Sequence, residues 1–208
     1  MLNSLHMEYR HRFAVEFQQL LEQQTFAETI FRNYDILFNK KDAPFHHTLR
    51  HCFGCSFEGM ALGLSRVWDQ SRNNNTISIP NLVTIFERYD YLGCKGLQPG
   101  QHDRENYDIL YADPIRPRLR VVRTEFLAHS IMLGTSRDRD NSDIKGQQFG
   151  IMNGDAINYC RKTLDLMFSL NEQLTFSKCQ AKRTMDEMAD EWNIRHLAFL
   201  KHFTPHVQ

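Results

Sequence analysis

An arginine and a histidine, Arg123 and His129, are separated by five residues in the segment 121–130. Arginine binds phosphate oxygens through a planar, permanently charged fork of N–H donors. Histidine exchanges a proton near neutral pH, so it can act as a general acid or base. Glu125 precedes His129 by four residues, where a carboxylate can fix the tautomer of the imidazole and favour its protonated form. These residue types and spacings predict a site that handles a phosphate group.

Arginines are concentrated around this pair. Residues 114–139 contain six arginines, no lysine and two acidic residues, a local excess of four positive charges in a chain of zero formal net charge. On a helix, Arg116, Arg120 and Arg123 would share a face that suits phosphate contact, and a solvated surface face is the alternative. At about 100° per residue, however, Arg123 and His129 would lie about 240° apart around a helix. A joint site therefore requires a groove around the helix or a second copy of the chain.

Length and composition are typical of one soluble globular domain: 208 residues, 41% hydrophobic and 24% charged. A zero net charge provides no global attraction for DNA or an anionic membrane, so any anion site must be local. No apolar run approaches the ~20 residues of a membrane span, and the N-terminus is too polar for a signal peptide. Five scattered cysteines favour free thiols over a disulfide framework. We therefore expect a cytoplasmic protein with no membrane or DNA partner.

Apolar residues recur at helical spacing along the chain, and no strand-like series is found. Helices are predicted over residues 8–32, 42–69, 78–91, 123–133, 155–174 and 183–203. Loops are predicted over residues 71–76, 93–106 and 135–154. Gly59 and Gly63 would let another helix approach closely, and Ser78 followed by Pro80 is a typical helix start. The pattern predicts an all-α bundle of about five to seven helices, forming a single domain over residues 1–208.

Two segments carry longer motifs. Residues 56–69 (SFEGMALGLSRVWD) contain a Leu-X-Arg-X-X-Asp pattern, and a Ser-Ile-X-X-Leu pattern follows at 78–86 (SIPNLVTIF). Residues 123–129 (RTEFLAH) contain an arginine, five further residues and a histidine that follows an alanine. Together these motifs resemble the HEPN superfamily, in the branch associated with abortive phage infection, over roughly residues 45–135. The chain would then be one HEPN-like domain with helical extensions at both ends.

The resemblance implies a helical bundle that forms a homodimer and brings two Arg–His motifs together across the interface. Active members of the family are ribonucleases that need no metal or other cofactor. Arg123 would then hold the scissile phosphate, and His129 would transfer protons as the RNA 2′-hydroxyl attacks. Thr124 departs from the family, because many active members have Asn, Asp or His directly after the arginine. A toxin or phage-defence role, with a protein antitoxin as partner, is the corresponding expectation.

Two alternatives remain beside the ribonuclease. A catalytically inert HEPN-like module could bind RNA, a nucleotide or a protein partner, and an unrelated helical interaction protein could carry Arg123 and His129 without catalysis. His47, His51, Cys52 and Cys55 are zinc-type ligands at helical spacing. We expect no metal there, because structural zinc sites usually combine two ligand pairs from separate segments and one helix cannot wrap four of its own side chains around an ion.

Overall fold

The computed structural model describes residues 2–38, 45–70, 77–88, 101–121, 153–173 and 183–203. Within these ranges the chain forms eight helices and no strand, so the predicted all-α bundle is confirmed. The helices are α1 (Leu2–Arg32), α2 (Tyr34–Phe38), α3 (His46–Val67), α4 (Ile79–Arg88), α5 (Gln101–Ala112), α6 (Ile115–Val121), α8 (Asn153–Gln173) and α9 (Met185–Lys201).

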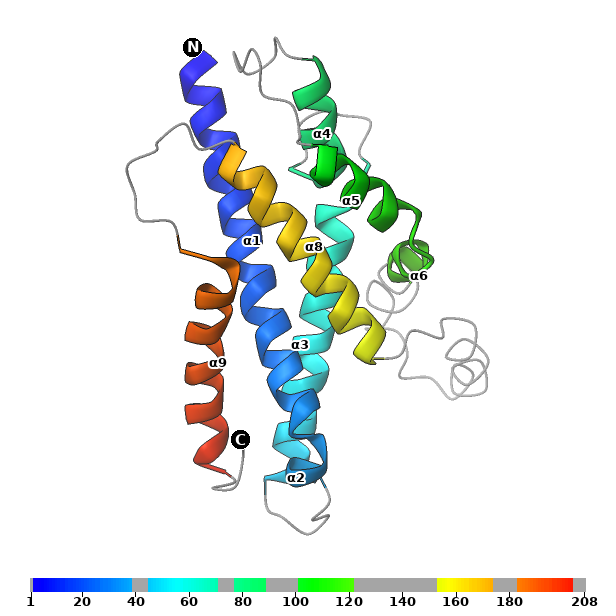
Figure 1. Cartoon of the computed structure of the whole chain (residues 1–208). Coiled ribbons are helices and arrows are strands. Elements are labelled where there is room, and N and C mark those ends of the chain that lie inside the picture. The colour runs from blue at the N-terminus through cyan, green and yellow to red at the C-terminus, as the bar shows by residue number, and fades with distance from the viewer. Residues whose placement is uncertain are drawn as a thin grey trace, which may run out of the picture.

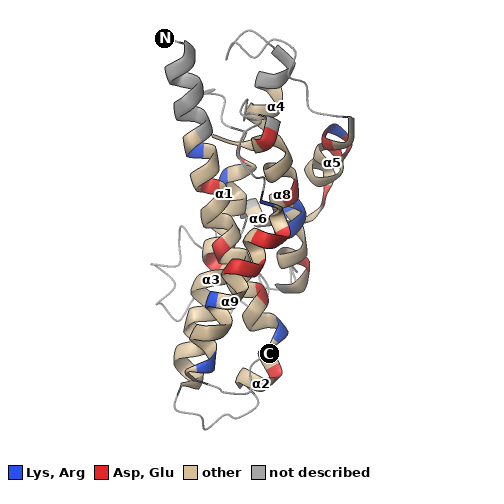
Figure 2. Cartoon of the chain, turned by 60° about the vertical axis from the view of Figure 1, so that its left-hand side comes forward, with Lys and Arg blue, Asp and Glu red and all other residues tan. Residues whose placement is uncertain are grey.

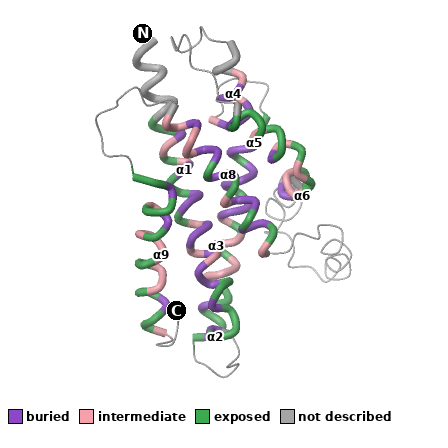
Figure 3. Tube along the Cα trace, in the orientation of Figure 1, coloured by how far each residue is buried: buried purple, intermediate pink, exposed green. Residues whose placement is uncertain are grey.

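Helix α1 is the centre of the bundle. It packs against α3, α8 and α9, while α5 and α6 pack against α8 and α3 at one side (Figure 1). The apolar residues of α1 recur every three or four positions, which places Phe13, Phe17, Leu20 and Leu21 on one buried stripe. Figure 3 shows buried positions where α1, α3 and α8 face one another. The core is therefore built around a helix from the beginning of the chain.

Close packing of α1 and α3 depends on two glycines. A Cβ atom built on Gly63 would lie 2.9 Å from Leu20 Cδ1, and one built on Gly59 would lie 3.0 Å from Gln23 Nε2. Leu20 is almost fully buried, so its side chain has little room to move. Gly59 and Gly63 therefore allow α3 to approach α1 closely, as the sequence predicted.

An alanine scan of α3 glycines separates this packing from helix propensity. Gly54 has no neighbour within 4 Å of its Cβ position, so we expect Gly54→Ala to raise the free energy of unfolding by about 0.5–1 kcal/mol. Gly63→Ala should instead lower it, since overpacking against Leu20 costs about 1–3 kcal/mol. Urea unfolding measures both variants. Equal stabilisation by the two substitutions would contradict the close approach of α1 and α3.

Local signals explain several helix boundaries. The Ser78 hydroxyl accepts a hydrogen bond from the Asn81 backbone N–H at 3.4 Å, at the start of α4, as the sequence indicated. Thr184 and Glu187 form a reciprocal capping box at the start of α9, with distances of 3.1 and 2.7 Å. These hydrogen bonds satisfy backbone N–H groups that have no partner within the helix.

The helices differ from the sequence prediction in three places. The loop predicted over 93–106 ends at residue 100 or earlier, because α5 begins at Gln101. Its first turn is polar because it is mostly exposed, and its apolar residues begin only at Tyr107. The five-residue helix α2 was not predicted, since it is too short to show periodicity. Helix α6 precedes the predicted helix over 123–133, which lies outside the described residues. With α2, α5 and α6 the described part contains eight helices, above the predicted five to seven.

The charges and helix lengths agree with the composition. Figure 2 shows acidic and basic positions on the same helices rather than on separate ones. None of the described helices combines the length and the apolar character that crossing a lipid bilayer requires.

Candidate functional site

The structure describes only part of the predicted phosphate site. Arg123, Thr124, Glu125 and His129 lie outside the described residues. Arg120 lies in α6, one turn after Arg116, but its side chain is not among those that the structure describes. Arg116 is therefore the predicted site residue whose surroundings can be examined.

Helix α6 is held at a defined position. The Asp113 carboxylate accepts a hydrogen bond from the Ile115 backbone N–H at 2.8 Å and so satisfies a donor at the start of this helix. Leu119, in the middle of α6, is 2% exposed and belongs to the main core. Helix α6 also packs against α3 and α8. This short helix places the Arg116 backbone beside the end of α3.

The Arg116 guanidinium lies over an aromatic ring. Its Cζ atom is 3.8 Å from the centre of the Tyr111 ring, within the range of a cation–π interaction. The Arg116 Nε atom is buried and has no hydrogen-bond partner. A buried donor without an acceptor costs about 1–3 kcal/mol, and the contact with Tyr111 orders the arginine despite this cost.

Tyr111 belongs to a cluster of aromatic rings. Trp68, at the end of α3, lies 5.9 Å from Tyr107, 6.4 Å from Tyr111 and 6.3 Å from Tyr159 between ring centres. The Trp68 indole N–H donates to the Thr163 hydroxyl at 3.2 Å. Rings at these distances attract one another, and the hydrogen bond fixes the indole orientation. These contacts hold the aromatic rings in defined positions beside Arg116.

Tyr107 and Tyr159 of this cluster stay protonated near neutral pH. Burial raises the pKa of Tyr159 far above its usual range, the Asp113 charge adds to the effect, and the positive charge of Arg116 opposes it. Tyr159 donates its hydroxyl proton to the Leu110 carbonyl at 3.0 Å. Burial is also the main reason that the pKa of Tyr107 is raised. These hydroxyls therefore serve as structural groups and not as acids or bases.

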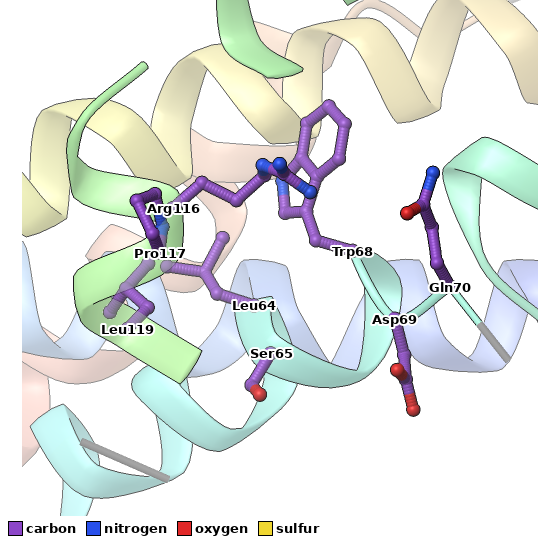
Figure 4. A pocket seen from close by; sticks show the side chains of 8 residues that line it. All are labelled: Leu64, Ser65, Trp68, Asp69, Gln70, Arg116, Pro117 and Leu119. Carbon is purple, nitrogen blue, oxygen red and sulfur yellow. The ribbon is translucent and has the colours of Figure 1, made fainter. Parts of the chain in front are cut away.

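A small pocket opens between the end of α3 and the start of α6 (Figure 4). Its volume is about 120 Å³. In Figure 4 the Arg116 guanidinium extends toward the Trp68 indole, and the Asp69 carboxylate points away from it. The lining residues are Leu64, Ser65, Trp68, Asp69, Gln70, Arg116, Pro117 and Leu119. The pocket thus joins the end of the 56–69 motif to the beginning of the arginine-rich segment.

The histidines and cysteines of α3 form a pair and not a larger cluster. Cys55 Sγ lies 3.5 Å from His51 Nε2, and Cys52 and Cys55 are free thiols. In the described ranges, no group of three or more His, Cys, Asp or Glu side chains is arranged to hold a metal ion.

Sequence reasoning missed a second polar region, between α1 and α9. His196 Nε2 lies 3.2 Å from the Thr25 hydroxyl, and the Thr29 hydroxyl donates to Asn193 at 3.0 Å. The His196 ring also stacks on Trp192, with 5.7 Å between ring centres. A groove of about 870 Å³ between α1, α3 and α9 is lined partly by these two rings. The four-residue spacing of Trp192 and His196 was the sequence signal that could have indicated this region.

The His196 contact predicts a pH dependence. Burial lowers the pKa of His196, the positive charge of Arg195 lowers it further, and a hydrogen bond with the Glu22 backbone opposes both. The unfolded chain then binds more protons than the folded chain. The free energy of unfolding should therefore keep the whole contribution of neutral His196 above about pH 6.5, and it should decline as the pH falls below that value.

Denaturation at pH 7.5 and 5.5 checks this dependence. His196→Gln removes the titration and should flatten the decline relative to the wild type, while His202→Gln, at an exposed position, should not. The charged groups that line the same groove are Glu22, Arg66 and Arg195. An identical decline in the His196→Gln variant would contradict the assignment.

Comparisons with known proteins found no relative: no family model, no curated protein and no solved structure matches this chain.

Proposed function

We propose that this chain is a HEPN-like RNA-binding protein that cleaves RNA without a metal ion as a homodimer. The observation that carries the proposal is the position of Arg116, which is braced on Tyr111 with an unpaired, buried N–H group beside a pocket. The same pocket is lined by Asp69, the last residue of the 56–69 motif. The end of the 56–69 motif therefore lies beside the beginning of the arginine-rich segment 114–139.

The charge distribution favours a polyanion at this place. The chain has no net charge, whereas residues 114–139 have an excess of four positive charges. Arg116 and Arg120 would contact RNA phosphates ahead of Arg123, because arginine presents its donors in a fork that matches phosphate oxygens. Arg116 is already ordered by Tyr111, so less side-chain entropy is lost on binding.

The chemistry of cleavage follows from the two remaining residues. The 2′-hydroxyl oxygen attacks the adjacent phosphorus, and the bond from phosphorus to the 5′-oxygen breaks. His129 transfers a proton in this step, and Arg123 stabilises the charge that develops on the phosphate oxygens. The products are a cyclic phosphate and a free 5′-hydroxyl end. Glu125 would orient the imidazole, and Thr124 would support the arginine.

A homodimer completes this site. On a helix, Arg123 and His129 would lie about 240° apart, so each motif would need the other copy to provide the facing residue. A protein of this kind would act in the cytoplasm as a toxin or phage-defence effector, and a protein antitoxin would be its natural partner.

RNA cleavage in EDTA tests the proposal. Purified protein should cleave an end-labelled single-stranded RNA in the presence of the chelator and leave a cyclic phosphate end. An otherwise identical oligonucleotide with 2′-deoxy sugars should stay intact, because it lacks the attacking hydroxyl. Cleavage of both, or cleavage that requires added metal, would contradict the mechanism.

Thr124 favours a second candidate, a HEPN-like module that binds RNA, a nucleotide or a protein partner without cleaving. Threonine has a hydroxyl but cannot ionise or present an amide next to Arg123. RNA binding with no product in the same assay would support this candidate.

A further inference from the structure

We propose that Cys55 is a modification site that accepts a glutathionyl group from a small acidic disulfide, glutathione disulfide. Cys55 lines the open groove of about 870 Å³ between α1, α3 and α9. The charged residues of the same lining are Glu22, Arg66 and Arg195. The inference is independent of the proposed function, because none of these residues lines the pocket beside Arg116.

The Cys55 thiol is exposed and has a base beside it. Its Sγ atom lies 3.5 Å from His51 Nε2, one helical turn earlier on α3. An imidazole at this distance can take the thiol proton and leave a thiolate, the form of cysteine that attacks disulfides. Cys52 is only partly exposed and Cys160 is buried. Of these three described thiols, Cys55 is therefore the most open to a reagent.

The modification is a thiol–disulfide exchange. The Cys55 sulfur attacks one sulfur of glutathione disulfide, a new S–S bond forms, and the S–S bond of the reagent breaks. The proton that His51 takes from Cys55 goes to the departing glutathione thiolate. Cys55 is thereby oxidised and one glutathione is reduced, so no further oxidant is needed.

Helix α3 places a cation within reach of a glutathionyl group on Cys55. Arg66 follows Cys55 by eleven residues, so the two positions differ by only about 20° around the helix and about 16 Å along it. Three extended residues span about 10 Å, and the side chains of Cys55 and Arg66 cover the remainder. A carboxylate of the added tripeptide can therefore meet the Arg66 guanidinium.

The charges of the groove complement those of a glutathionyl group, which has two carboxylates and one ammonium. Arg66 and Arg195 are the two cations of the lining. Each contacts one glutamate through a single terminal nitrogen, at 3.1 and 2.8 Å, and each is at least half exposed. Such surface pairs contribute little, and the other N–H groups of each fork remain for a carboxylate. Glu22, which forms no ion pair within the described ranges, suits the ammonium.

Cys52 is not positioned to remove the added group. Cys52 and Cys55 are three residues apart on α3, which places their Cβ atoms about 5–6 Å apart. A disulfide needs about 3.5–4.5 Å between these atoms. The mixed disulfide on Cys55 should therefore persist until an external thiol reduces it.

Peptide mapping by mass spectrometry tests the assignment. The folded full-length chain is incubated with glutathione disulfide, quenched and digested in acid, and searched for glutathionyl adducts on each cysteine. We expect an adduct on Cys55, none on Cys160, and complete release by dithiothreitol. Cys55→Ser should remove that adduct, whereas Cys52→Ser should keep it. A wild-type chain with no adduct on Cys55, or with the adduct mainly on Cys52, would overturn the proposal.

A neutral reagent isolates the role of charge. Bis(2-hydroxyethyl) disulfide undergoes the same exchange but has no carboxylate. Arg66→Gln should slow the reaction of Cys55 with glutathione disulfide about two- to fivefold, the size of one exposed charge pair, and leave the rate with the neutral disulfide unchanged. His51→Gln should slow both reagents alike, because it removes the base and not the charge match.

Arg50→Gln is the matched control for Arg66→Gln. Arg50 is also an exposed arginine of α3, but it does not line the groove, so its replacement should leave both rates unchanged. Equal slowing by the two arginine variants would overturn the match between the groove and an acidic disulfide. Slowing of the neutral disulfide by Arg66→Gln would overturn it as well.

Discussion

The His129→Ala variant is expected to cleave RNA about 10²–10⁴-fold more slowly than the wild type, which is the usual contribution of a general acid or base. The Arg123→Ala variant should lose about 10²–10³-fold, because a charged donor to the developing oxyanion is removed. Both residues lie outside the residues that the structure describes, so the folding of each variant is checked separately. Single-turnover rates in EDTA measure both effects.

Mixing the two inactive variants tests the dimer. In a site built from Arg123 of one copy and His129 of the other, a mixed dimer of Arg123→Ala and His129→Ala chains keeps one intact site of two. With random exchange, half of the dimers are mixed, so about a quarter of wild-type activity should return. A site contained within one chain would give no recovery.

Folding controls accompany these variants. Each should retain the helical circular dichroism and the unfolding midpoint of the wild type. Wild-type cleavage rates in a well-folded His129→Ala chain would contradict the proposed role of that histidine.

Replacing Trp68 with alanine should lower the free energy of unfolding by about 3–5 kcal/mol, the typical cost of removing a buried aromatic side chain. Trp68 is 5% exposed and lies among Tyr107, Tyr111 and Tyr159, so its removal leaves a cavity that these rings cannot close without moving. Chemical denaturation followed by circular dichroism measures the change, because the substitution also removes fluorescence.

Two matched variants show which part of the Trp68 environment matters. Trp192→Ala should cost clearly less, because Trp192 is only partly buried against the same core. Thr163→Val keeps the side-chain shape but leaves the Trp68 N–H buried without its acceptor, at a cost of about 1–3 kcal/mol. Equal losses in Trp68→Ala and Trp192→Ala would mean that Trp68 is not the stronger anchor.

The helices could be predicted where apolar spacing was long and regular. Phe13, Phe17, Leu20 and Leu21 define α1 by period alone, and their burial matches it. Phe31 lies at helical spacing from these residues but is 43% exposed. Its position near the end of α1 lies beyond the part of the helix that the main core covers, which periodicity cannot reveal.

The surroundings of Arg116 could be predicted only in part. The arginine-rich segment was visible in the sequence, because charge is a local property. The approach of Trp68 to Tyr107, Tyr111 and Tyr159 was not, because it depends on how α3, α5 and α8 pack across the bundle. The orphan N–H of Arg116 is likewise a result of burial and could not be read from spacing.

The central position of α1 has a consequence for biosynthesis. The ribosome makes α1 well before α8 and α9, which cover two of its sides. At about 5–20 residues per second, roughly ten to thirty seconds pass between the end of α1 and the end of α9. During that interval α3 can pair with α1, but part of the apolar stripe waits for partners. The nascent chain is therefore most exposed to aggregation, and most in need of a chaperone, before its last two helices are translated.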